Sequence, residues 1–248
     1  MIYLKSSSEI ELMKKSGRIV AETLAKIEEV IRPGITTKEL DKIAEEYITG
    51  CGARPSFKGY NGFPATLCTS VNDEVVHGIP GNRVLQEGDI VSIDCGAIYN
   101  GFHGDAARTF PVGKISPETQ KLIDVTRESF FEGIKYAVVG NRIGDISHAI
   151  QVYVESHGFS VVRDYVGHGI GREMHEEPPV PNYGKPGRGP KLTKGMALAI
   201  EPMVNMGTYA VKELSDGWTV VTADGKMSCH YENTVVILED GPEVLTII

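Results

Sequence analysis

Apolar residues recur at helical spacing in the first part of the chain. Residues 9–31 follow three serines that can each cap a helix, and their apolar positions lie broadly three or four residues apart, which predicts an amphipathic helix. Pro33 and Gly34 end it. A second helix is predicted from Thr36 to Gly50, and the glycine-, proline- and aromatic-rich residues 50–64 are predicted to form a loop.

Strand patterns follow this loop. Residues 65–72, 89–99 and 103–112 are rich in apolar and β-branched residues and are predicted to be β-strands. Asn100 and Gly101 separate the last two of these segments and are typical of a tight turn. The sequence therefore predicts a β-hairpin centred on this turn.

The pattern then repeats at an offset of 106 residues, with Gly34 aligned on Gly140. This alignment superimposes four further positions without a gap: Leu40 on Ile146, Tyr47 on Tyr153, Ile48 on Val154 and Gly52 on Gly158. Residues 85–94 align with residues 192–201 at an offset of 107, so Asp94 and Glu201 occupy equivalent strand ends. Residues 77–80 and 175–178 share His-x-x-Pro at an offset of 98. Three matches in the same order indicate an internal duplication.

The duplication predicts one catalytic domain over residues 1–248, made of two pseudo-equivalent halves at about 1–112 and 113–248. The expected fold class is α+β, with an antiparallel sheet backed by helices and pseudo-twofold symmetry. Equivalent carboxylates should then converge near the pseudo-twofold axis. The length of 248 residues is sufficient to bury a core.

Composition narrows the range of functions. Lys and Arg number 25 against 33 Asp and Glu, a formal net charge of −8, which disfavours a nucleic-acid binder because such proteins carry basic surfaces. No apolar run approaches the ~18 residues of a membrane-spanning helix, and the N-terminus has no signal-peptide core. Four cysteines without a Cys-x-x-Cys pair indicate neither a disulfide scaffold nor zinc or redox chemistry. We expect a reduced, cytoplasmic, globular protein.

Four carboxylates interrupt otherwise apolar strands: Asp94, Asp105, Glu201 and Glu232. Each alone is explained as well by a salt bridge or a solvent-exposed strand end. Together they would carry four negative charges, which a buried cluster holds only if cations offset them. Two divalent ions would do so, and paired ions bridged by carboxylates and water are used in hydrolysis. Such ligands suit Mn, Co, Fe(II) or Zn, and the sequence does not choose among these metals.

Three of the seven histidines are candidates for chemistry. His168 lies between glycines in VGHGIG, where the backbone can approach an ion closely, and it is the first choice for an imidazole ligand. His77 and His175 form the pseudo-equivalent pair, and they are candidate hydrogen-bond donors to a substrate carbonyl or amide. Each of this pair is explained equally well as an ordinary loop histidine. The other four are assigned structural roles: His103, His148, His157 and His230.

Other enzyme classes lack their usual motifs here. The sequence contains no His-Glu-x-x-His, Gly-x-Ser-x-Gly, P-loop or Gly-x-Gly-x-x-Gly pattern. Mononuclear zincins, serine hydrolases, P-loop NTPases and dinucleotide-dependent enzymes are therefore disfavoured.

Four longer segments carry a family resemblance. SIDCGAIYNGFHGDAARTF, VGHGIGREMHEEP, AIEPM and YENT closely resemble the type I methionine aminopeptidases, and the resemblance covers essentially the whole chain. That family has the pita-bread fold, an internally duplicated α+β structure, in agreement with the repeat above. The resemblance implies removal of the initiator methionine from new proteins and peptides, preferentially before a small second residue. It also implies the compact bacterial form, without the insertion of type II members or the zinc-binding extension of many eukaryotic ones.

The resemblance implies a ligand set for two divalent metal ions. Asp94 would bind one ion, while His168 and Glu201 would bind the other. Asp105 and Glu232 would bridge the two.

The resemblance also implies catalytic roles. Metal-bound hydroxide would attack the first peptide carbonyl, and Glu201 would transfer protons to and from the attacking water and protonate the leaving amine. His77 and His175 would contact the substrate, with His175 supporting the developing oxyanion. An apolar pocket for the methionine side chain would be lined by Tyr60, Phe63, Cys68 and Trp218. Phe57 and Met174 depart from the residues common in the family, a cysteine and an aromatic residue.

Two other readings compete with this one. A proline-directed peptidase of the same fold, such as aminopeptidase P or prolidase, would use similar ligands, but those enzymes usually carry an extra N-terminal domain, for which the early first helix leaves no room. A catalytically inactive binding module for protein or RNA would be expected to lose ligands and gain a basic surface. The expected partners are N-terminal methionyl peptides and nascent proteins, with ribosome contact as a further hypothesis. We expect a monomer that binds neither nucleic acid nor membrane.

Overall fold

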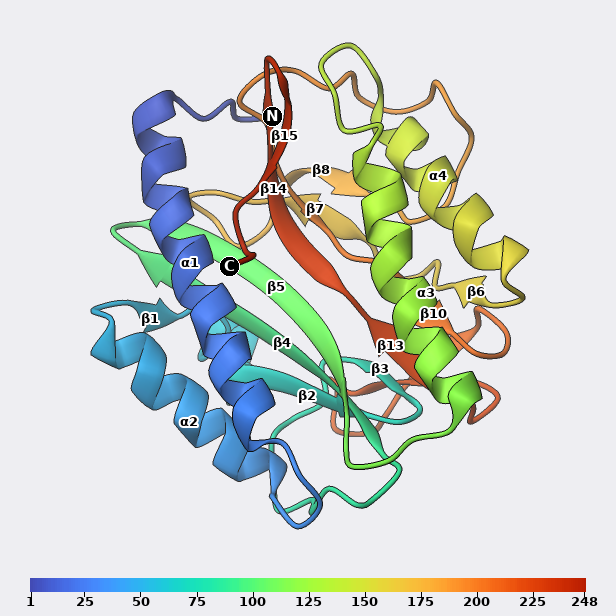
Figure 1. Ribbon diagram of the computed structural model, residues 1–248. Helices are drawn as coiled ribbons and strands as arrows, with labels where there is room; N and C mark the ends of the chain where they lie inside the picture. The colour runs from blue at the N-terminus through green and yellow to red at the C-terminus, as the bar shows by residue number, and fades with distance from the viewer.

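A pair of helices followed by a run of strands occurs twice along the computed structural model, which describes residues 1–248 (Figure 1). The helices are α1 (Ser7–Val30), α2 (Thr37–Gly50), α3 (Pro117–Ile134) and α4 (Ile143–Ser156), with a short 3-10 turn at Tyr60–Gly62. The strands are β1 (Arg54–Pro55), β2 (Leu67–Val71), β3 (Glu74–Val76), β4 (Ile90–Tyr99), β5 (Phe102–Pro111), β6 (Ser160–Val161), β7 (Gly167–Gly169), β8 (Glu176–Val180), β9 (Ala197–Ile200), β10 (Met203–Asn205), β11 (Val211–Glu213), β12 (Val220–Thr222), β13 (Ser228–His230), β14 (Glu232–Leu238) and β15 (Gly241–Val244). No helix is long and apolar enough to cross a membrane.

The first two helices begin where the sequence supplies capping residues. The Ser6 side chain accepts a hydrogen bond from the Glu9 N–H, and the Glu9 carboxylate accepts one from the Ser6 N–H. Thr36 and Glu39 form the same reciprocal pair at the start of α2. Such capping boxes satisfy backbone donors that a helix start leaves unpaired. The predicted helices are confirmed, with Ser6 as the capping serine of α1.

The β4–β5 hairpin also follows the prediction. Asn100 and Gly101 both have positive φ, 47° and 82°, as a tight hairpin turn requires at its two central residues. Ten residue pairs join the two strands in register from Ile90–Pro111 to Tyr99–Phe102. The predicted loop over residues 50–64 needs one correction, because Arg54–Pro55 pairs with β4 as the short strand β1.

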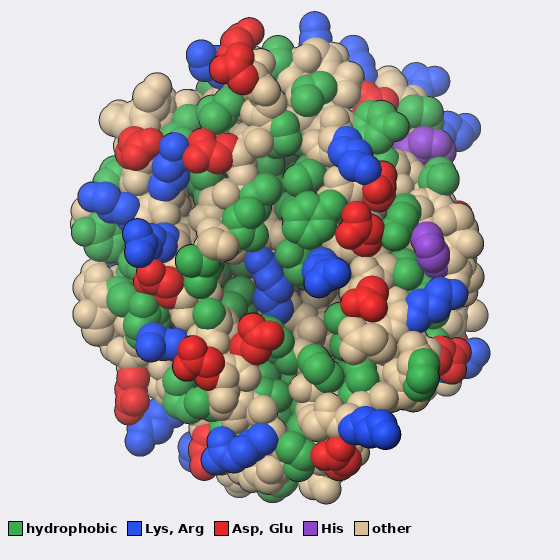
Figure 2. Space-filling model, viewed as in Figure 1, with side chains coloured by type: hydrophobic (Ala, Val, Ile, Leu, Met, Phe, Trp, Pro, Cys, Tyr) green, Lys and Arg blue, Asp and Glu red, His purple; other side chains and the backbone are tan.

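One antiparallel sheet of nine strands forms the centre of the molecule. Its main path runs β1-β4-β5-β14-β9-β7-β8, with β2 beside β4 and β15 beside β14. Two three-stranded sheets, β13-β10-β6 and β11-β12-β3, complete the β-structure. Helices α1 and α2 lie over one half of the central sheet, and α3 and α4 lie over the other half on the same side (Figure 1). Acidic and basic side chains are interspersed over this helical face (Figure 2).

Equivalent hydrogen bonds occur within each half, at the residue offset seen in the sequence. Gly34 N–H donates to the Leu85 carbonyl at 2.8 Å, and Gly140 N–H donates to the Leu192 carbonyl at 3.1 Å. Gly34 and Gly140 have φ of 97° and 98°, a left-handed conformation that favours glycine. Two isolated β-bridges repeat in the same way: Thr36 with Val84 and Arg142 with Lys191. Each half also has its own large hydrophobic core between its helices and the sheet.

A buried ion pair connects the segment before α1 to the second half of the chain. The Lys5 ammonium contacts the Glu176 carboxylate, and each side chain is only 5% exposed. The other Glu176 oxygen accepts hydrogen bonds from the backbone N–H groups of Arg172 and Glu173. Breaking a buried pair leaves the remaining charge without its partner, so this contact should stabilise the loop that precedes β8.

We expect Lys5→Met to lower the free energy of unfolding by about 3 kcal/mol, because Glu176 would stay buried without a cation. Urea unfolding followed by circular dichroism measures the change. The matched control is Arg18→Met, which removes an ion pair to Glu22 from a side chain that is 76% exposed and should change stability little. Equal effects of the two substitutions would contradict the assigned importance of the buried pair.

Candidate active site

The register of three neighbouring strands brings three carboxylates together. Asp94 on β4 lies opposite Ala107 on β5, and Ala107 lies opposite Glu232 on β14. Asp105 precedes Ala107 by two residues, so it projects from the same face of the sheet. The small Ala107 side chain at the centre of this row leaves space between the acids. This placement follows from strand pairing alone.

Two further strands of the same sheet, β9 and β7, bring Glu201 and His168 to this cluster. Ile200, the last residue of β9, pairs with Asn233, so Glu201 follows directly beside Glu232. His168 on β7 pairs with Ala199 on β9. His168 Nε2 lies 3.7 Å from Asp105 Oδ2 and 3.7 Å from Glu201 Oε1. The five residues predicted as metal ligands therefore form one cluster.

No lysine or arginine forms an ion pair with these carboxylates, and the only basic side chains within 4 Å of them are the imidazoles of His168 and His230. In the absence of a cation, desolvation raises the pKa of Asp94 to about 7 and that of Glu201 to about 8. Desolvation, reinforced by the neighbouring acids, also raises the pKa values of Asp105 and Glu232 well above their usual range. Desolvation lowers the pKa of His168 to about 3, so its imidazole is neutral and able to ligate.

The donor set fits divalent metal ions. Asp94 Oδ1, Asp105 Oδ1 and Glu232 Oε1 are buried and have no hydrogen-bond partner. Buried polar atoms are normally paired, so unpartnered oxygens of this kind fit a site for a divalent cation. Two groups of three side chains have ligand atoms within 4.8 Å of one another: Asp94, His230 and Glu232, and Asp105, His168 and Glu232. Each group offers carboxylate oxygens and one imidazole nitrogen, and Glu232 belongs to both groups. This arrangement fits a site for two neighbouring metal ions.

His230 belongs to this cluster, although the sequence analysis assigned it a structural role. Its Nε2 lies 3.5 Å from Glu201 Oε2 and 3.6 Å from Glu232 Oε2. A sequence signal was present, because His230 precedes Glu232 by two residues and alternation along an extended chain places both on one face. The intervening Tyr231 packs against the other side, in the core between the sheet and α3.

All the residues predicted to contact the substrate line one cavity, together with the five predicted metal ligands. The cavity has a volume of about 190 Å³, and fourteen residues line it: Phe57, Tyr60, Asn61, Phe63, Cys68, His77, Asp94, Asp105, His168, Met174, His175, Glu201, Trp218 and Glu232. Asn61 is the one lining residue that the sequence analysis did not name. It lies in the 3-10 turn, where no periodic pattern marks it.

The two predicted substrate histidines lie at the cavity wall. His175 stacks on Tyr60 with ring centroids 5.3 Å apart, and its Nδ1 lies 2.8 Å from the Tyr60 hydroxyl. Its ring also lies 4.2 Å from that of His168, beside the carboxylate cluster. His77 packs edge-on against Tyr165, and desolvation lowers the pKa of His77 to about 4.

The remaining cavity wall is apolar. Five buried residues form a small hydrophobic cluster there: Phe57, Phe63, Ala65, Cys68 and Met174. Trp218 closes the cluster, meeting Phe63 edge-to-face at 5.1 Å between ring centroids. Phe57 and Met174 are part of this wall. The cavity thus combines polar groups at the cluster with an apolar recess.

Comparison with known proteins identifies the family. A model of metallopeptidase family M24 matches residues 11–239. The chain is 68% identical to a methionine aminopeptidase of Clostridium perfringens over 248 residues, which cover 100% of both chains. The chain belongs to family M24, among the methionine aminopeptidases. The resemblance inferred from the four sequence segments is therefore confirmed.

Two solved peptidase structures share the fold. The methionine aminopeptidase of Thermotoga maritima superimposes with a TM-score of 0.99 at 51% identity, covering 100% of both chains. The predicted pita-bread fold is confirmed. An Xaa-Pro dipeptidase of Bacillus anthracis matches with a TM-score of 0.77 at 24% identity over 98% of this chain and 61% of its own. That likeness shows a common fold.

We expect the metal-free M24 protein to lose stability as pH rises from about 6.5 to 8. The raised pKa values of Asp94 and Glu201 mean that the native state binds more protons than the unfolded chain in this window. The free energy of unfolding therefore falls as pH rises, by at most ~1.4 kcal/mol per pH unit for each carboxyl. Below this window the buried histidines oppose the trend, because their lowered pKa values make the unfolded chain bind more protons.

Thermal unfolding of chelator-treated protein at several pH values measures this slope. Saturating Mn²⁺ should remove the decline, because bound metal holds the carboxylates deprotonated and stabilises the native state. A flat profile without metal, or a decline that Mn²⁺ leaves unchanged, would show that the cluster is not a metal site.

Proposed function

We propose that this chain removes the N-terminal methionine from peptides and newly made proteins, preferentially when the second residue is small. The observation that carries the proposal is a single cavity shared by a carboxylate–imidazole cluster, two further histidines and an apolar recess, in a chain of the methionine aminopeptidase family. Hydrolysis needs an activated water, oxyanion support and a place for the side chain, and the cavity offers a group for each.

Five residues would hold two divalent ions: Asp94, Asp105, His168, Glu201 and Glu232. When bound, these ions supply a water nucleophile at neutral pH and polarise the scissile carbonyl. We propose Co, Mn, Fe(II) or Zn for both positions, since all four accept mixed oxygen and imidazole donors. The fit rests on the unpartnered buried oxygens of the cluster.

Glu201 is the proposed proton carrier. Its side chain lines the cavity, with one carboxylate oxygen 3.7 Å from His168 Nε2 and the other 3.5 Å from His230 Nε2. A carboxylate that lines the cavity beside the other candidate ligands is placed to exchange a proton with a water and with a substrate held there. It would take a proton from the attacking water and deliver it to the departing amine.

His175 is the proposed donor to the developing oxyanion. When the Tyr60 hydroxyl donates to Nδ1, the imidazole carries its proton on Nε2 and can donate it to a substrate oxygen. His77, which lines the same cavity, would also contact the substrate. Donors fixed in advance in this way stabilise charge that develops only during the reaction.

The apolar recess supports selection of methionine. Tyr60, Phe63, Cys68 and Trp218 are the proposed lining, with Phe57 and Met174 completing it. Sulfur and aromatic groups make adaptable contacts with an unbranched thioether side chain. A proline-directed peptidase is the weaker alternative, because the structures named as prolidases or X-Pro peptidases match this chain at 23–24% identity and support the fold alone.

The proposal extends to the setting of the reaction. We propose that the chain acts in the cytoplasm as a monomer and as one catalytic domain over residues 1–248, with two halves that meet near residue 112. Nascent chains, reached at the ribosome, would be its natural substrates. Charges of both signs on the helical face give no support for a nucleic-acid partner (Figure 2).

Metal reconstitution tests the activity. Chelator-treated protein receives Mn, Co, Fe(II) or Zn separately, and amino-acid release is followed from Met-Ala-Ser and from the matched Ala-Pro-Ser. We expect metal-dependent release of methionine alone. Glu201→Gln should lose turnover while keeping the fold, because an amide cannot carry the proton. Release only before proline would move the enzyme to the alternative class, and full activity of Glu201→Gln would refute the assigned chemistry.

We expect His175→Ala to lower kcat by about 10² to 10³ and to raise KM by less, because the lost donor acts mainly on the transition state. Tyr60→Phe is the matched control, since it keeps the stacked ring and removes only the hydroxyl bonded to Nδ1. It should cause a smaller loss of kcat. A His175→Ala variant with normal kcat and raised KM would make His175 a binding residue instead.

A further inference from the structure

The imidazole of His230 is buried, and neither a hydrogen bond nor a role proposed so far accounts for its Nε2 atom. It is 2% exposed, and its Nε2 is buried without a hydrogen-bond partner. The atom nevertheless points into the carboxylate cluster, where Asp94 and Glu232 offer oxygens within ligand spacing of it. A buried nitrogen left unpaired beside several acceptors requires a physical reason.

The distances favour metal ligation over hydrogen bonding. His230 Nε2 lies 3.5 Å from Glu201 Oε2 and 3.6 Å from Glu232 Oε2. Hydrogen bonds from nitrogen to oxygen span ~2.7 to 3.2 Å, so neither contact qualifies. Two ligands that share a tetrahedral ion with bonds of ~2.1 Å lie about 3.4 Å apart. The His230 separations are close to that value.

The arrangement mirrors that of the other imidazole. His168 Nε2 lies 3.7 Å from Glu201 Oε1, whereas His230 Nε2 faces Glu201 Oε2. One imidazole thus lies on each side of the same carboxylate. The two candidate ligand groups likewise contain one histidine each and share Glu232.

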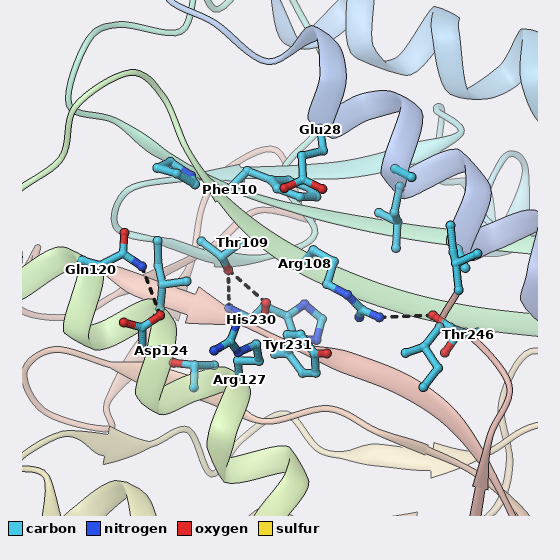
Figure 3. Close-up of a pocket in the computed structure, with 18 residues that line it drawn as sticks. Glu28, Arg108, Thr109, Phe110, Gln120, Asp124, Arg127, His230, Tyr231 and Thr246 are labelled. Atoms are coloured by element: carbon cyan, nitrogen blue, oxygen red, sulfur yellow. Dashed lines mark hydrogen bonds between the residues drawn. The ribbon is translucent and has the colours of Figure 1, made fainter.

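The backbone that carries His230 and Glu232 is held by hydrogen bonds from two adjacent residues of β5. Thr109 Oγ1 accepts a hydrogen bond from the His230 N–H at 3.0 Å and donates one to the His230 carbonyl at 2.9 Å (Figure 3). Arg108 Nη1 donates to the carbonyl of Glu232 at 2.6 Å. Both residues come from β5 and line the cavity of about 570 Å³ between α1 and α3. A ligand segment held this firmly presents its imidazole in one orientation.

We propose that His230 is a ligand, through Nε2, of the ion that Asp94 and Glu232 bind, so that each of the two ions has one imidazole. The inference deepens the proposed function, on whose metal centre it rests. An imidazole in a position otherwise made of carboxylates favours the borderline metals Co, Fe(II) and Zn over Mn, which prefers oxygen donors.

His230→Gln tests the proposal, because glutamine keeps an N–H donor of similar reach and is a poor metal ligand. Metal-free wild type and variant are titrated with Co²⁺ and with Mn²⁺ by calorimetry, and the visible spectrum of bound Co²⁺ is measured. We expect one of the two Co²⁺ affinities to fall at least tenfold, the Mn²⁺ affinities to change less, and the Co²⁺ spectrum to shift. His148→Gln, on α4 outside the cluster, is the matched control and should change none of these.

Wild-type affinities and spectrum in His230→Gln would overturn the proposal and make His230 a hydrogen-bond donor to the carboxylates. Methionine release by that variant would then leave the proposed function standing. No metal binding by wild-type protein would refute the proposed function itself.

A measurement on wild type remains decisive if His230→Gln does not fold. Protein labelled with ¹⁵N in its histidine rings and loaded with two equivalents of ¹¹³Cd²⁺ should show metal–nitrogen coupling for two imidazoles, those of His168 and His230. Coupling to a single imidazole would overturn the proposal.

Discussion

Desolvation of four neighbouring carboxylates is the constraint on which the rest of this structure depends. Without cations the cluster retains protons, as the raised pKa values of Asp94 and Glu201 indicate. Two divalent ions would allow all four groups to ionise, at the cost of requiring exact positions for their oxygens. The long β4–β5 hairpin and its pairing with β14 provide those positions, because strand register fixes which side chains meet.

The duplicated architecture explains why the site lies at the centre. Each half contributes a helix pair, a glycine turn bonded to a following leucine, and a strand that reaches the cluster. The expected equivalence of strand ends holds only for Glu201, which follows β9, because Asp94 lies within β4. The halves then diverge where chemistry requires asymmetry. The first half supplies most of the apolar recess, including Phe63 and Cys68, whereas the second half supplies His168 and His175. The same repeat thus forms a symmetric frame around an asymmetric cavity.

Local signals in the sequence predicted much of this structure. Capping at Ser6, the turn at Asn100 and Gly101 and the repeat itself are encoded by neighbouring residues. The carboxylate cluster was predictable because acids in apolar strands are costly, while the individual metal, substrate and pocket roles came from family resemblance. Contacts between distant segments were not predictable, and Lys5 and Glu176 are 171 residues apart. The place of His230 in the cluster was signalled only by its two-residue spacing from Glu232, because its own strand has three residues.

Anomalous X-ray diffraction from crystals grown with Mn²⁺ tests the central claim most directly. The account predicts two anomalous peaks in the cluster, ~3.5 to 4 Å apart. One should lie within bonding distance of His168, and both should lie within bonding distance of Glu232. A fully ordered cluster with no peak, or peaks only at surface carboxylates, would contradict the claim that these buried acids are held together by metal.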